Sequence, residues 1–249
     1  MRPEVARGAK MLSWMHLTLS GAADHTLAPQ IAWHGRLMVA GWSILLPTGI
    51  LAARFFKVLP RQNWPERLDN RAWWHAHRWL NCAGLAAAAL ALFLILRRPA
   101  GAGALAFAHR AAGFAVLGLG VFQLLGGVLR GTKGGPTGER MRGDHFDMTP
   151  RRVRFERLHK SLGWLAMPLA ALATVFGLVL ADAPRWMAVL IAAWWLLLVA
   201  AFVALQKGGR CFDTYQAIWG PDPTLPGNQR KPIGWGIRRI PARHDHPGR

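Results

Sequence analysis

The sequence predicts an all-α, polytopic membrane protein in which four helices form a bundle core and a fifth transmembrane helix is peripheral. Its composition indicates the class, because 52% of the 249 residues are hydrophobic and only 17% are charged, whereas about a quarter are charged in a typical soluble domain. Five apolar runs are long enough to cross a hydrocarbon core of roughly 30 Å, which takes about 20 helical residues. The runs are continuous, rich in Ala and Leu and without period-2 alternation, which disfavours β-strands.

The five predicted spans cover about residues 33–55, 75–96, 104–129, 159–181 and 186–205. A short Gly/Ala-rich connection at 97–108 makes the second and third spans neighbours. The connection at 182–186 is a tight turn in which Pro184 is placed to start the next helix. Segment 130–158 is long, polar and rich in Gly and Pro, which favours an ordered or half-ordered loop.

The expected organisation is an N-terminal segment 1–30, a membrane domain 31–206 and a basic tail 207–249. Met11–Leu19 is predicted to lie on the membrane surface as a short helix. The first 30 residues lack an apolar stretch long enough for a cleavable signal peptide, so we expect none. The tail from Lys207 is too rich in Pro and Gly for a regular helix to be expected.

Basic residues are divided unequally between the two predicted membrane faces, within a formal net charge of +19. The N-terminal 32 residues and the connections 97–108 and 182–187 contain six Lys and Arg, namely Arg2, Arg7, Lys10, Arg97, Arg98 and Arg185. The segments 54–73 and 130–158 and the tail from 206 contain 21. The positive-inside bias therefore predicts a multi-pass membrane protein with its N-terminus outside and its C-terminus in the cytoplasm.

The basic residues are expected to contact lipid and not nucleic acid. Anionic lipid headgroups neutralise basic residues at a membrane surface. The basic residues alternate with the spans instead of forming one continuous patch, which disfavours nucleic-acid binding. Simple solvation of polar loops explains why these residues are exposed, but it does not explain their asymmetry.

Four histidines lie just inside the starts of four consecutive spans: His34, His77, His109 and His159. Successive spans run antiparallel, so the first and third histidines lie near one membrane face and the second and fourth near the other. Two neutral imidazoles can fill both axial positions of a haem iron, which favours electron transfer over chemistry at the metal. Any one of them alone could be a hydrogen-bonded packing residue, yet ionisable groups in spans are usually functional. Because the fifth span has none, the sequence predicts a four-helix core that holds two haems.

Several nearby residues bear on this interpretation. Glycines follow two of the histidines by four residues, at Gly113 and Gly163, and leave room for a flat macrocycle or a neighbouring helix. Cations near the span ends are candidates to pair with haem propionates or with an anionic reductant, or else to snorkel to the interface; they are Arg36, Arg54, Lys57 and Arg110. His75 competes with His77, since residues two apart point to roughly opposite sides of a helix.

Four segments carry a resemblance to a known family: WHGRLMVAGWSILLPTGILAARFFK, AWWHAHRWLN, AHRAAG and RLHKSLGW. In this order and spacing they resemble the cytochrome b561 family, especially bacterial members and the membrane part of eukaryotic proteins that attach it to an extracellular DOMON domain. The resemblance covers about residues 31–205, without a DOMON domain and with a longer 130–158 loop and tail. It implies two b haems, held by His34 with His109 and by His77 with His159, and so selects His77 over His75.

The predicted function is transmembrane electron transfer through two bis-histidine b-type haems, one near each face. The protein would be an oxidoreductase in the sense of an electron-transfer cytochrome. A haem-containing, quinone-linked or structural subunit of a larger membrane complex is the alternative. The donor and acceptor stay open between protein, quinone and small reductant. The loop 130–158 and the tail are expected either to dock such a partner or to lie on lipid, through basic and aromatic residues: Arg140, Arg142, Arg151, Arg152, Arg154, Arg230, Phe146, Tyr215 and Trp219. Cys82 and Cys211 form no C-x-x-C-H, which argues against covalent c-type haem.

Overall fold

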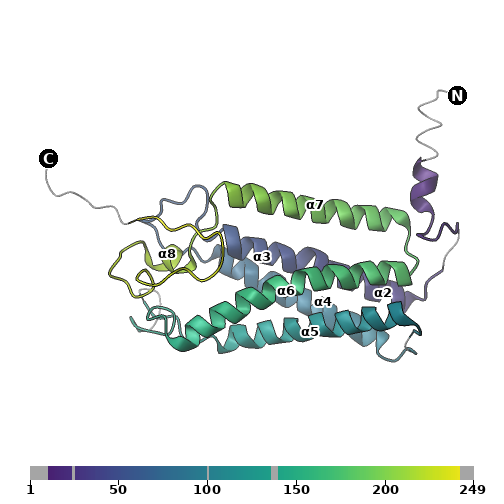
Figure 1. Cartoon of the computed structure of the whole chain (residues 1–249), viewed down its shortest axis with the longest axis horizontal. Helices are drawn as coiled ribbons and strands as arrows, with labels where there is room; N and C mark the ends of the chain where they lie inside the picture. Colours follow the sequence, from purple (N-terminus) through teal and green to yellow (C-terminus); the bar gives the residue numbers. More distant parts are fainter. Residues whose placement is uncertain (1–10, 24–25, 100, 136–139, 242–249) are drawn as a thin grey trace, which may run out of the picture. The chain divides into compact units, whose positions relative to one another are not determined.

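A computed structural model describes residues 11–23, 26–99, 101–135 and 140–241 (Figure 1). Within these ranges the regular secondary structure is helical, and five helices are long and apolar enough to cross a membrane. This confirms the predicted all-α class of polytopic membrane bundle. Arg2, Arg7 and Lys10, which the charge analysis assigned to the outer face, lie outside the described residues.

The first span is three helical pieces instead of the one continuous helix expected over 33–55. Helix α2 covers Pro29–Met38 and begins at a proline, whose fixed φ suits the first helical turn. The π-helix η1 follows at Val39–Leu45, and α3 completes the span at Leu46–Phe55. Hydrogen bonds that reach five residues along the chain form this rare π geometry, which an apolar sequence pattern does not reveal.

The remaining helices are α4 (Ala72–Ile95), α5 (Ala104–Leu129), α6 (Pro150–Leu180), α7 (Arg185–Lys207) and α8 (Thr214–Trp219). The fourth span was expected from 159, but its helix begins nine residues earlier, because the charged stretch after Pro150 is helical although it is not apolar. The expectation of no regular helix in the tail was wrong for α8. Asp213 caps this helix by accepting a hydrogen bond from the backbone N–H of Tyr215, and the Pro/Gly-rich stretch begins only after it.

The chain divides into two compact units whose boundaries fall inside the long helices. Unit 1 comprises Met1–Pro47, Asn81–Gly120 and Ala166–Ala200, and unit 2 comprises Thr48–Leu80, Val121–Leu165 and Ala201–Arg249. Each of the five spans therefore contributes one stretch to each unit.

Unit 1 is packed around small residues. Its buried cluster consists of Trp42, Leu46, Ala88, Val116, Ala166 and Ala170. A Cβ atom added at Gly41 would lie 2.7 Å from the carbonyl oxygen of Gly84, so η1 and α4 touch through their backbones. Since apolar burial does not drive helices together inside lipid, close packing of this kind is what holds them. The indole N–H of Trp194 adds a hydrogen bond of 2.7 Å to the carbonyl oxygen of Ser43 in η1.

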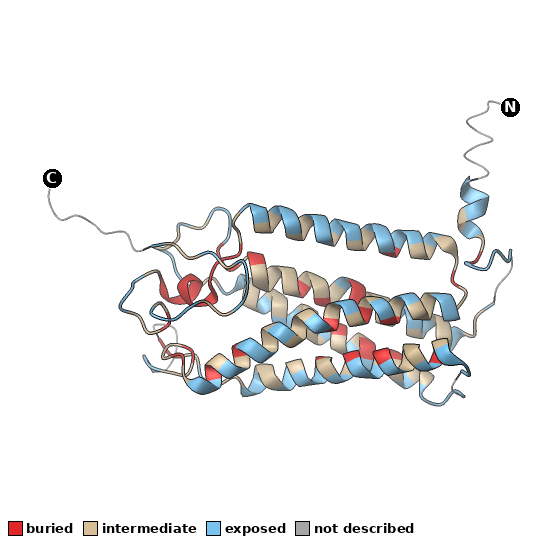
Figure 2. Ribbon diagram, in the orientation of Figure 1, coloured by how far each residue is buried: buried red, intermediate tan, exposed pale blue. Residues whose placement is uncertain are grey.

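Helix α7 fits the predicted peripheral fifth helix. Its one buried residue is Ile191, and Figure 2 shows the rest of its length as exposed or intermediate. An apolar helix with so little buried surface is suited to contact with lipid.

Unit 2 contains a folded cap built from the loop after α5 and from the tail. All six residues of α8 are buried, and Tyr215, Ile218 and Trp219 pack against Met148. The Tyr215 hydroxyl donates a 2.7 Å hydrogen bond to the carbonyl oxygen of Phe146. The aromatic residues expected to anchor a partner therefore serve the chain's own core, and that part of the docking hypothesis is wrong for Tyr215 and Trp219.

The contact between η1 and α4 gives a stability prediction. Gly41→Ala places a methyl group against the Gly84 carbonyl, and overpacking of this kind typically costs about 1–3 kcal/mol. Gly118→Ala is the matched control, because a Cβ there has no neighbour within 4 Å, and glycine is less favourable than alanine inside a helix by roughly 0.5–1 kcal/mol. In detergent, thermal unfolding followed by circular dichroism should occur at lower temperature for Gly41→Ala and not for Gly118→Ala. Equal unfolding temperatures for the two variants would contradict the close contact.

Candidate functional site

Unit 1 brings together two of the predicted histidines. The rings of His34 on α2 and His109 on α5 have centroids 6.2 Å apart and planes at 76°. The Nδ1 atom of His34 lies 3.0 Å from the carbonyl oxygen of Ala91, and that of His109 lies 3.0 Å from the carbonyl oxygen of Ala173. A carbonyl only accepts, so each Nδ1 carries the proton and each Nε2 keeps a lone pair for a metal.

Unit 2 brings together the other two. The rings of His77 on α4 and His159 on α6 have centroids 6.0 Å apart and planes at 78°. His77 uses Nδ1 in a 3.1 Å hydrogen bond to the carbonyl oxygen of Gly49. The buried Nδ1 of His159 differs, because no described residue offers it a hydrogen bond. His75 is exposed, so the histidine beside His159 is His77, the one that the resemblance selected.

Both pairs have the spacing that a shared metal requires. With metal–imidazole bonds of about 2.0 Å and about 1.1 Å from ring nitrogen to ring centre, two imidazoles on opposite sides of one metal have centres about 6 Å apart. The observed 6.2 Å and 6.0 Å match this value. Among the described residues no group of three or more His, Cys, Asp or Glu could hold a metal ion. A haem would need only two protein ligands, and each histidine pair offers two imidazoles at this spacing.

Glycines adjust the space around the histidines. A Cβ atom at Gly177 on α6 would lie 3.1 Å from Cε1 of His109, so the absence of a side chain at Gly177 leaves space for the His109 ring. A Cβ at Gly113 would meet nothing within 4 Å, whereas one at Gly163 would lie 3.2 Å from Nε2 of Gln123. Gly163 thus makes room for a side chain of the neighbouring helix, one of the two roles expected for it.

Gln123 is a site residue that the sequence analysis missed. Its amide donates a 2.7 Å hydrogen bond to the backbone carbonyl of His159, which ties α5 to α6 beside the ligand pair. A cavity of about 160 Å³ opens there, lined by Phe122, Gln123, Gly126, Leu129, Phe155, Leu158 and His159. The available signal was that Gln123 is the one polar side chain after Arg110 in an otherwise apolar span.

The four predicted cations have partners within the chain. Arg54 donates to Gln206 Oε1 at 2.9 Å and to the Trp235 carbonyl oxygen at 3.0 Å, with its guanidinium 4.2 Å from the Trp235 ring centroid. Buried Lys57 donates to the backbone carbonyl oxygens of Arg54 and Phe212, and burial lowers its pKa to about 8. A role for either residue toward a haem stays a prediction.

The other two cations lie in unit 1. The guanidinium of exposed Arg36 lies 5.2 Å from the Trp33 ring centroid, and Arg110 donates a 2.6 Å hydrogen bond to the carbonyl oxygen of Gly101. Their proposed pairing with propionates is likewise a prediction.

One known protein is similar to part of this chain. It is a cytochrome b561, DM13 and DOMON domain-containing protein of Arabidopsis thaliana, 38% identical over 73 residues. The match supports a cytochrome b561-like membrane part. It covers 29% of this chain and 7% of the relative, so the chain spans a small fraction of that protein's length. No family model matches the chain, and no solved structure gives a significant match.

A buried ionic cluster lies near the His77–His159 pair, in the same unit. Glu156 accepts hydrogen bonds from Arg152 at 3.0 Å and from Lys160 at 2.8 Å. Nε2 of His145 is 3.6 Å from the same carboxylate, too far for a hydrogen bond, and its ring packs edge-on against those of Tyr215 and Trp219. The sequence analysis did not select His145, because it lies in a polar loop outside the apolar spans.

The burial of His145 predicts an acid-sensitive cap. Burial, reinforced by the positive charge of Arg152, lowers the pKa of this histidine to about 3, although the carboxylate of Glu156 opposes the shift. Between about pH 6.5 and pH 3, His145 then binds a proton in the unfolded chain but not in the folded chain. Its contribution to the free energy of unfolding is therefore fully present above pH 6.5 and decreases as the pH falls. At about 1.4 kcal/mol per pKa unit, the loss is on the order of a few kcal/mol.

His145→Gln should flatten this dependence, because glutamine does not titrate. The measurement is the pH dependence, from 7 to 4, of thermal unfolding and of proteolysis of the tail in detergent. Exposed His75→Gln is the control and should retain the wild-type profile. If His145→Gln loses stability in acid as steeply as the wild type, the assignment fails.

Proposed function

We propose that this chain carries electrons across a membrane through two b-type haems, one held by His34 and His109 and the other by His77 and His159. The observation that carries the proposal is the pair of histidine contacts, with ring centroids 6.2 Å and 6.0 Å apart, on helices able to cross a membrane. The similarity to a protein named as a cytochrome b561 supports it. A haem held by such a histidine pair would supply one-electron transfer.

The chain's own residues hold the ligands for this task. The backbone carbonyls of Ala91, Ala173 and Gly49 accept the Nδ1 protons of His34, His109 and His77, and so present Nε2 of each ring as the ligand atom. With both histidines of a pair bound, the iron would have no position left for oxygen or substrate. The apolar side chains of the spans keep water away, which limits the reorganisation that accompanies a change of charge.

The membrane sidedness of the proposal rests on the charge asymmetry. We assign the N-terminus to the periplasm and the C-terminus to the cytoplasm of a bacterial inner membrane. Consecutive spans cross in opposite directions, so His34 and His109 belong to the periplasmic half and His77 and His159 to the cytoplasmic half. Lipid is the first partner, and a protein, quinone or small reductant exchanges electrons at either face.

A quinone-linked role is the alternative that one observation favours. The cavity beside His159 is lined mainly by apolar side chains and contains the amide of Gln123, a combination suited to a flat ligand with carbonyl groups. Rapid reduction by a quinol and none by a water-soluble reductant would favour this role.

Substitution of the histidines tests the haem assignment. His34→Ala and His109→Ala should each remove the same haem, and His77→Ala and His159→Ala should each remove the other. The reason is that closed coordination needs both histidines of a pair. The haem content per chain of gently purified protein should fall from two to one in each variant, with the same residual visible spectrum within a pair. Exposed His75→Ala is the control and should retain both haems. Wild-type protein without a haem spectrum would refute the proposal.

The topology has a separate test. Single cysteines introduced at exposed Gln229 in the tail and at exposed Gly101 before α5 should react with a membrane-impermeant thiol reagent from opposite sides. In cells with a permeabilised outer membrane, the cysteine at 101 should label at once and the one at 229 only after the inner membrane is opened. Labelling of residue 229 in intact spheroplasts would reverse the orientation without affecting the haem assignment.

A further inference from the structure

Arg130 occupies an unusual position beside the second histidine pair. It directly follows α5 and is partly buried, and its guanidinium carbon lies 3.9 Å from the centroid of the Trp74 ring. The Trp74 ring in turn lies 6.3 Å from the ring of His77, at an angle of 37°. The Trp74 indole therefore lies close to both the cation and a proposed ligand. Arginine that rests on an aromatic face keeps its five N–H donors for partners around its edge.

Other cations of unit 2 have carboxylate partners, and Arg130 has none among the described residues. Arg152 lies 3.0 Å from Glu156, Arg142 lies 2.6 Å from Asp147, and Lys133 contacts Asp69. No hydrogen bond or ion pair joins the Arg130 guanidinium to the described part of the chain.

The charges nearest Arg130 have its own sign. Burial, together with the positive charges of Arg152 and Arg78, lowers the pKa of Arg130 to about 10. A partly buried cation among cations is unfavourable unless an anion joins it. The arrangement therefore favours an anionic ligand from outside the described residues.

We propose that Arg130 binds a propionate carboxylate of the haem held by His77 and His159. This rests on the proposed function. A guanidinium matches a carboxylate with two parallel hydrogen bonds, and the propionates are the acidic groups that a haem bound at this pair would bring. Arg54 and Lys57, the candidates from the sequence in this unit, direct donors to Gln206 and to backbone carbonyls instead. A lipid phosphate is the other source of an anion, and the experiment separates the two.

The pairing has an electrical consequence. Reduction of the iron adds a negative charge, so a fixed guanidinium beside the porphyrin stabilises the reduced state and raises the midpoint potential. Removal of the charge should lower the potential of this haem and leave the other unchanged.

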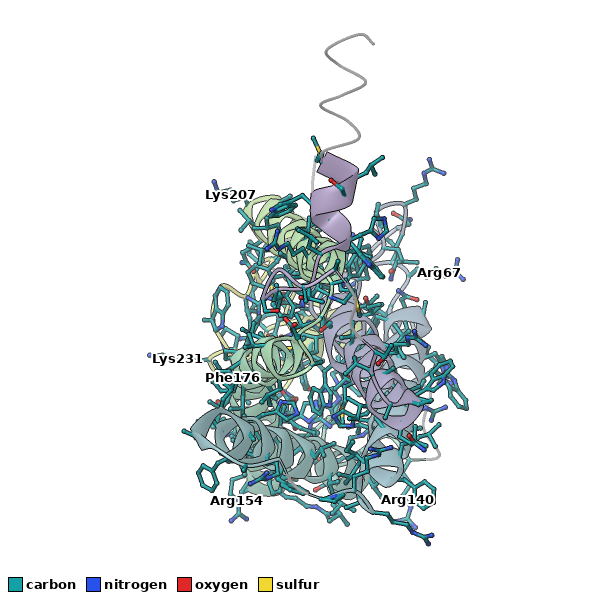
Figure 3. The ribbon with its side chains drawn as sticks, turned by 90° about the vertical axis from the view of Figure 1, so that its right-hand side faces the viewer. Arg67, Arg140, Arg154, Phe176, Lys207 and Lys231 are labelled. Carbon is teal, nitrogen blue, oxygen red and sulfur yellow. The ribbon has the colours of Figure 1, made fainter. Side chains whose placement is uncertain are left out.

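Two substitutions on the full-length haem protein form the test. Arg130→Gln removes both the positive charge and the paired N–H donors of the guanidinium. Arg154→Gln is the matched control, because Arg154 is exposed and its side chain points away from the ribbon (Figure 3), with one hydrogen bond of 3.4 Å to the Pro150 carbonyl oxygen. Resonance Raman spectra report hydrogen bonding at the propionates through their bending bands, and redox titration reports the two potentials. Both are measured in nanodiscs of neutral phosphatidylcholine and of anionic phosphatidylglycerol.

The expected result is a shifted propionate bending band and a lower midpoint potential for one haem in Arg130→Gln, in both lipids, with neither change in Arg154→Gln. A His34→Ala background, which should retain only the His77–His159 haem, should show the same shift. Arg130→Lys keeps the positive charge but lacks the paired guanidinium donors. It should therefore shift the Raman band and lower the midpoint potential by less than Arg130→Gln does. This third variant also serves if Arg130→Gln does not fold.

Two results would overturn the assignment. One is a set of Raman bands and potentials in the Arg130 variants that equal those of Arg154→Gln. The other is an effect of Arg130→Gln confined to anionic nanodiscs, which would assign the site to lipid phosphate. Failure of the proposed function is distinct, since the wild-type protein would then have no haem spectrum at all.

Discussion

Three of the four paired imidazoles bond to a backbone carbonyl of a neighbouring helix, and these bonds organise the structure. His34, His109 and His77 each satisfy Nδ1 with a backbone carbonyl of another helix, at Ala91, Ala173 and Gly49. Every bond of this kind fixes a tautomer, a ring direction and the spacing of two helices together. The paired imidazoles are thus a product of helix packing, and the glycine contacts that bring α4 to η1 are part of the same arrangement.

The cap shows how the polar part of the chain complements the spans. Glu156 lies in the charged first turns of α6 and holds Arg152 and Lys160. Lys160 also donates to the backbone carbonyl of Ile233, so the same cluster fastens the tail. A tail with many Pro and Gly residues is therefore ordered by side chains from the helices. Its buried aromatic residues close the end of unit 2 and are not a free surface for a partner.

Hydropathy was enough to predict the membrane spans. It was not enough to predict residue roles that depend on contacts between helices. The second, third and fifth spans lie within three residues of their expected bounds, because apolar length marks them directly. Charged turns hid the true start of α6, since a helix can continue beyond an apolar run. The meeting of His34 with His109 followed from antiparallel order alone. The roles of Gln123, Gly177 and Arg130 depend on which helix lies opposite them, and no local pattern carries that information.

The π-helix η1 sets the rotational phase of everything that follows it in the first span. Its hydrogen-bonded rings hold one residue more than those of an α-helix, and each residue turns an α-helix by about 100°. If Val39–Leu45 wound as a regular α-helix with all its residues kept, Gly49 and Arg54 would turn to another side of the helix. The carbonyl that serves His77 would then face elsewhere. The irregular turn thus acts as an inserted spacer, and a relative without it would need its partner for His77 at a different position in the sequence.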